Sequence, residues 1–77
     1  MNKFVLYSEL RPDKYRALLD EVGLTIAGAG TFFGYDDRTA RRWVSGALPI
    51  PIPVAMVLSL MRHHRLTPDD VMNIMSS

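Results

Sequence analysis

The sequence predicts a compact all-α domain of five helices. Three observations support this fold class. Apolar residues recur at helical spacing in five segments, residues that favour helix starts precede those segments, and glycine or proline separates them. A chain of 77 residues can form one small hydrophobic core, so residues 1–77 are expected to be a single domain.

The first helix is expected to begin at Pro12 and to end before Gly23. Proline suits the first turn because its missing N–H needs no partner there, and Asp13 favours the positive end of the helix dipole. A glycine just past the last apolar residue ends a helix readily. The residues expected on the buried face are Tyr15, Leu18, Leu19 and Val22.

The second helix is expected over residues 26–33, with Thr25 as its N-terminal cap and Gly34 just past its end. This helix is intrinsically weak, because Gly28 and Gly30 each cost about 1 kcal/mol against alanine. Tertiary packing must therefore hold it in place. A glycine in such a helix also lets another helix approach closely.

The third helix is expected over residues 37–45, between the cap Asp36 and the terminator Gly46. At about 100° per residue its side chains divide into two faces. The face expected in the core carries Ala40, Trp43 and Val44, and the opposite face carries Arg38, Arg41, Arg42 and Ser45. From the residues alone, the second face is either an ordinary solvated surface or a surface that binds a polyanion.

The net charge of +1 conceals an uneven distribution along the chain. Acidic and basic side chains balance over residues 1–35, whereas residues 36–66 carry five arginines against two aspartates. Asp69 and Asp70 then make the C-terminal end negative. A basic surface, if one exists, is therefore expected in the middle of the chain.

Two more helices are expected after a proline-rich connection. The fourth, over residues 52–64, is apolar almost all round, which exceeds what one core face can bury in a small domain. The fifth begins at the cap Thr67 and Pro68. We expect residues 52–75 to form a homodimer interface, and an apolar strand or arm at Phe4–Tyr7 to contribute to it. The expected interface residues are Met56, Leu60, Met61, Val71, Met72 and Met75.

The stretch LTIAGAGTFFGYDDRTARRWVSG, residues 24–46, resembles the helix-turn-helix motif of the lambda-repressor/Cro-like family without a gap. The following prolines and apolar helix also resemble small phage and bacterial regulators of this type. Two positions depart from the family pattern: Ile26 stands where a polar residue often contacts phosphate, and Gly28 is an extra glycine. The positions that carry the likeness are Leu24, Thr25, Gly30, Gly34, Asp36, Thr39, Ala40, Trp43 and Gly46.

This resemblance implies that residues 26–33 position residues 37–45 in the major groove of DNA. It assigns base reading to Asp37, Arg38 and Arg42, and phosphate contacts to Arg41, Ser45 and Thr25. Tyr35, in the turn, either contacts the sugar-phosphate backbone or packs within the domain. An arginine can bind guanine O6 and N7 together, which is worth about 1–3 kcal/mol of discrimination. Asp37 either accepts a hydrogen bond from cytosine N4 or supports the start of the helix.

The function expected from this likeness is sequence-specific regulation of transcription, by a homodimeric autorepressor that binds an inverted repeat in double-stranded DNA. The alternative is a protein-interaction module, such as an antitoxin-like inhibitor, that keeps the fold without relying on DNA binding. An enzyme fits worst, because the chain lacks cysteine, a phosphate-binding glycine loop and a histidine beside a plausible nucleophile.

No cofactor or metal is expected. His63 and His64 are adjacent, so they do not share a helical face as two ligands of one ion would. The longest apolar stretch is too short to span a bilayer and is interrupted by prolines, and no targeting segment is evident. A cytoplasmic protein with no membrane partner is therefore expected.

Overall fold

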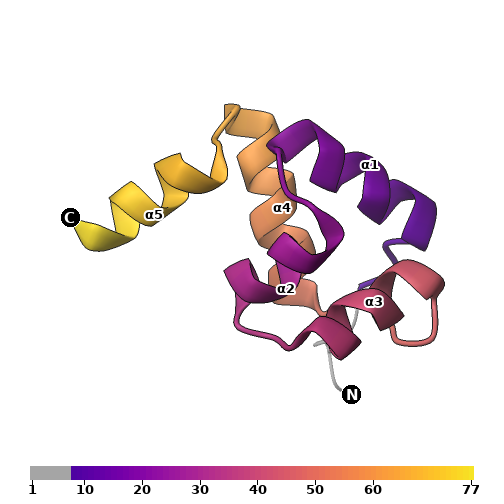
Figure 1. The fold of residues 1–77 in the computed structure, drawn as a ribbon. Helices are drawn as coiled ribbons and strands as arrows, with labels where there is room; N and C mark the ends of the chain where they lie inside the picture. Colours follow the sequence, from indigo (N-terminus) through magenta and orange to yellow (C-terminus); the bar gives the residue numbers. More distant parts are fainter. Residues whose placement is uncertain (1–7) are drawn as a thin grey trace, which may run out of the picture.

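The structure is a computed structural model that describes residues 8–77, and its regular elements there are five α-helices (Figure 1). The predicted all-α class and helix number are confirmed for this part of the chain. The expected strand or arm at Phe4–Tyr7 lies outside the described residues. The helices are α1 (Pro12–Val22), α2 (Ile26–Phe33), α3 (Asp37–Ser45), α4 (Ile52–His64) and α5 (Pro68–Ser76).

The predicted caps define where the helices begin and end. The Thr25 hydroxyl accepts a 2.8 Å hydrogen bond from the Gly28 N–H at the start of α2. At the start of α5, the Thr67 hydroxyl and the Asp70 carboxylate each accept a hydrogen bond from the other residue's N–H, which is a capping box. Gly34, with φ +83°, adopts the left-handed conformation that leads the chain out of α2.

The core is formed by residues of α1, α2, α3 and α4, together with Ile50 from the connection before α4. Trp43 of α3 is 1% exposed, and its ring forms a T-shaped pair with the ring of Tyr15 from α1 at a centroid distance of 6.1 Å. Such edge-to-face pairs are favoured by the aromatic quadrupole and bury a large apolar area. The buried residues packed in this cluster are Tyr15, Leu19, Val22, Ala29, Trp43, Ile50, Val54, Leu58 and Met61.

Helices α2 and α3 approach each other closely at Gly30. A Cβ atom added at Gly30 would lie 2.9 Å from the Ala40 Cβ and 3.3 Å from the Asp36 carbonyl oxygen. Only a residue without a side chain fits this contact. The expected close approach of another helix to the glycines of α2 is confirmed at Gly30, and it fixes how α3 is held against the domain.

One predicted interface residue is wrong. Met61 is 1% exposed and belongs to the core, so its side chain cannot meet a partner. Val54, Leu58 and Met61 recur at intervals of four and three residues, which places all three on the face of α4 that packs on α1. The large apolar residues of α4 that are exposed are Met56 and Leu60, 58% and 54% exposed.

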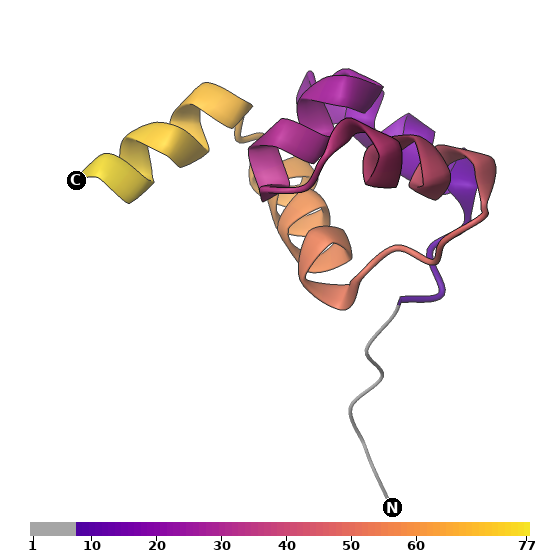
Figure 2. The ribbon, with the colours of Figure 1, turned by 60° about the horizontal axis from the view of Figure 1, so that its bottom comes forward.

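Helix α5 projects away from the other four helices, as Figures 1 and 2 show from two directions. All nine of its residues are described, and none of them is buried. Its larger apolar side chains are open to solvent, with Met75 73% exposed. Within residues 8–77, no helix is both long enough and apolar enough to cross a membrane.

Candidate nucleic-acid interface

Helix α3 carries one buried face and one basic exposed face. Ala40 and Trp43 are 0% and 1% exposed and anchor the helix in the core. The opposite side, which we call the arginine face, consists of Arg38, Arg41, Arg42 and Ser45, and all four residues are exposed. The predicted division of α3 into two faces is therefore confirmed.

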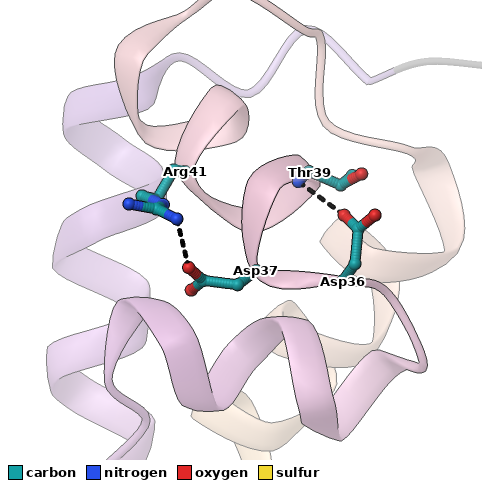
Figure 3. A network of polar contacts seen from close by, with 4 residues as sticks. All are labelled: Asp36, Asp37, Thr39 and Arg41. Atoms are coloured by element: carbon teal, nitrogen blue, oxygen red, sulfur yellow. Dashed lines mark hydrogen bonds and ion pairs between the residues drawn. The ribbon is translucent and has the colours of Figure 1, made fainter.

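Asp36 caps the helix that bears the arginine face. Its Oδ1 atom accepts a 2.7 Å hydrogen bond from the Thr39 N–H (Figure 3). Hydrogen bonds from the Thr39 side chain and backbone hold the pKa of Asp36 below its ordinary value, and the charges of Arg38 and Arg42 lower it further. Asp36 is therefore ionised at neutral pH, and its role is to fix the start of α3.

Asp37 pairs with Arg41 one helical turn later. The Asp37 Oδ2 and Arg41 Nη2 atoms are 2.5 Å apart, and the two side chains are 55% and 71% exposed. A dashed line marks this ion pair in Figure 3. An acid four residues before a base is the favourable orientation for such a pair on a helix. This pair was not predicted, although the spacing of four residues between Asp37 and Arg41 is a signal for it in the sequence.

Arg38 and Arg42 are the arginines of the arginine face that form no ion pair within residues 8–77. The two residues are four apart, so they lie one above the other on one side of the helix. Each guanidinium presents planar N–H donors that can bind a phosphate or a guanine edge with two hydrogen bonds.

Three predicted phosphate-contacting residues already have structural roles. The Thr25 hydroxyl caps α2, but the residue remains exposed. The Ser45 hydroxyl donates to the Arg42 carbonyl and accepts from the Ala47 N–H, both at 3.2 Å, at the end of α3. Tyr35 packs edge-on against Trp43 at 4.8 Å and stays 42% exposed. Each side chain still has an exposed part that a ligand could reach.

A second open surface lies on α4. A shallow groove is lined by Ser8, Ile52, Ala55, Met56, Ser59 and Leu60. Large apolar residues of α5 are exposed as well: Met72 and Met75, which are among the expected interface residues, and Ile74, which is not named among them. Val71 is only partly exposed and packs against the core. Helical spacing alone could not separate Ile74 from its apolar neighbours.

The described residues present an exposed basic surface on α3 and exposed apolar side chains on α4 and α5. Within residues 8–77, no three His, Cys, Asp or Glu side chains come together as they would around a metal ion. The rings of His63 and His64 lie perpendicular, with centroids 4.9 Å apart.

Comparisons of the chain with models of protein families, with curated proteins and with solved structures gave no match.

Proposed function

We propose that the protein is a sequence-specific DNA-binding transcriptional regulator of the lambda-repressor/Cro-like helix-turn-helix type. The observation that supports this most directly is the arginine face. It is a capped, exposed, basic helix surface whose opposite side is fixed in the core by Ala40 and Trp43. A rigidly held helix of this kind can enter the major groove as one piece.

In this proposal Asp37, Arg38 and Arg42 of α3 read base edges. Arg38 and Arg42 each bind guanine O6 and N7, and Asp37 accepts from an exposed amino group in the groove. Arg41, Ser45, Thr25 and Tyr35 contact the phosphate backbone and set the register of the protein on DNA. The absence of ion-pair partners for Arg38 and Arg42 within residues 8–77 supports their role, because no internal contact has to be broken.

The regulator acts as a homodimer on an inverted repeat. A two-fold dimer presents two recognition helices about 34 Å apart, one turn of DNA. Its interface uses the exposed apolar residues of α4 and α5, with Met56 and Leu60 on α4 and Met72 and Met75 on α5. Occupation of an operator in its own control region makes the protein an autorepressor.

The test is DNA binding by fluorescence anisotropy, with the DNA upstream of the protein's own gene as the probe. Wild type is compared with Arg38→Ala and Arg42→Ala at several salt concentrations. Lys14→Ala is the matched control, because it removes the same charge from an exposed position on α1. Each replacement should weaken specific binding by about 1–3 kcal/mol if its arginine contacts guanine, and the control should not.

A second candidate function is a protein-interaction module, favoured by the groove on α4 and the open face of α5. DNA binding that is weak, equal for all sequences and unchanged in both arginine variants would support this candidate. Circular dichroism of each variant shows whether a loss of binding is caused by unfolding of the variant.

A further inference from the structure

The three arginines of α3 are not equivalent, because one of them is held by an acid on its own helix. The Arg41 guanidinium contacts the Asp37 carboxylate at 2.5 Å, whereas Arg38 and Arg42 have no ion-pair partner within residues 8–77. Both members of the pair are more than half exposed, so water and dissolved anions reach them. A pair of this kind is weak in water and can be exchanged for another partner.

A DNA phosphate is the competing partner for Arg41. Arg41 contacts Asp37 through its Nη2 atom, so a phosphate that binds the guanidinium through Nη2 displaces the carboxylate. The Asp37 carboxylate then faces a polyanion without a counterion, which is unfavourable wherever the groove offers it no hydrogen-bond donor. The exchange therefore carries a penalty on most DNA sequences.

That penalty is removed where a base offers an amino group to Asp37. In the major groove, cytosine N4 is the donor that an aspartate accepts from, and thymine and guanine present only acceptors. Adenine also presents an amino group, N6, but its N7 acceptor lies beside it and repels a second carboxylate oxygen. A carboxylate held by cytosine no longer needs Arg41, which is then released to the backbone. The exchange thus links base identity to the strength of a phosphate contact.

From this geometry we infer that Asp37 is a specificity-determining residue that withholds Arg41 from the phosphate backbone until a cytosine amino group takes the carboxylate. The inference rests on the proposed DNA-binding function of α3. It assigns to Asp37 a role in rejecting wrong sites as well as in reading the right one.

The first test measures non-specific binding. A fluorescein-labelled 20-bp duplex of random sequence is titrated between 50 and 200 mM salt with wild type, Asp37→Asn, Arg41→Ala and the double variant. One extra phosphate contact steepens the slope of log affinity against log salt by about 0.9. Asp37→Asn should therefore bind more tightly at 50 mM, and its affinity should fall about 3.5-fold more than that of wild type over this range.

Two comparisons separate this effect from a simple change of net charge. Glu21→Gln removes the same charge from an exposed position on α1 and should leave the slope unchanged. In the Arg41→Ala background, Asp37→Asn should also leave the slope unchanged, because the arginine it releases is missing. A slope that does not steepen in Asp37→Asn, or that steepens equally without Arg41, overturns the inference.

The second test measures base preference by selection from a randomised duplex library. Wild type should enrich a cytosine at one position of each half-site, and Asp37→Asn should prefer adenine there, since asparagine binds adenine N6 and N7. The same base in both selections overturns the inference while leaving the proposed function intact. Failure of wild type and every variant to bind any DNA overturns the proposed function, and this inference with it.

Discussion

Gly30→Ala tests whether the contact between α2 and α3 fixes the domain. The new Cβ would lie 2.9 Å from the Ala40 Cβ, 3.3 Å from the Asp36 oxygen and 3.4 Å from the Tyr35 oxygen. Two carbon atoms prefer a separation of about 3.5–4.0 Å, so the helices must move apart by about 0.6 Å or more. No neighbour is the end of a flexible side chain, which places the cost near the upper limit of about 3 kcal/mol for overpacking.

Helix propensity offsets part of this cost, because alanine is better than glycine by about 1 kcal/mol in a helix. The expected net loss is about 2 kcal/mol in the free energy of unfolding, or a fall of about 10 °C in Tm for a domain of this size. Thermal unfolding followed by circular dichroism at 222 nm, with urea unfolding beside it, measures both quantities.

Gly28→Ala is the matched control. Its Cβ would meet the Thr25 Oγ1 at 2.7 Å, and this exposed side chain can rotate away. The lost cap of about 1 kcal/mol then balances the gain in propensity, so Tm should hardly change. In an Ala40→Gly background, Gly30→Ala should cost at least about 1 kcal/mol less. The reasoning would be refuted if Gly30→Ala were as stable as wild type. It would also be refuted if the effects of Gly30→Ala and Ala40→Gly on stability were strictly additive.

Three further predictions concern the core, the cap and the interface. Tyr15 is fully buried and its hydroxyl has no partner within residues 8–77, so Tyr15→Phe should raise the free energy of unfolding by about 1 kcal/mol. Burial raises the pKa of Tyr15 from 10.0 to about 12, so the native state favours the protonated form. Urea unfolding should therefore show wild-type stability falling between pH 10 and pH 12, and falling less in Tyr15→Phe. The lowered pKa of Asp36 means that its stabilising effect is present at neutral pH and is lost as pH falls below its ordinary 3.8. Thermal scans should show a lower Tm at pH 7 for Asp36→Ala, and for Asp36→Asn a near-normal Tm with less acid sensitivity. Met61→Ala should lower the free energy of unfolding by about 2–5 kcal/mol. Leu60→Glu should keep the fold and shift the protein to monomer in sedimentation. A Leu60→Glu variant that remains dimeric would argue against the proposed interface.

The helix boundaries could be predicted from the sequence because local chemistry decides them. Thr25, Asp36 and Thr67 each provide a side-chain oxygen that accepts a hydrogen bond from the backbone N–H three residues later. Such a bond depends only on neighbouring residues and needs no tertiary information. The buried face of α3 was equally predictable, because its apolar and basic residues alternate with the helical period.

The misassigned residue lies where the local signal is uniform. Helix α4 is apolar on nearly every side, so spacing alone could not tell whether Met61 or Leu60 faces the core. The packing of α1 decides it, and only the folded structure shows that packing. Asp37 posed a different problem: its pairing with Arg41 was available from the spacing, but its position suggested a contact with DNA instead.

The placement of α5 has a consequence for how the protein responds to its own abundance. Nine residues are fewer than the roughly 12–15 that an isolated helix needs to persist in water. A capping box favours the first turn of α5. Within residues 8–77, however, none of its residues is buried, and the partial burial of Val71 offsets little of the ordering entropy of the helix. If a second copy covers this helix, folding of the last turns and association become one equilibrium. Helix content would then rise with protein concentration, so that the folded fraction of α5 would depend on how much of the protein is present.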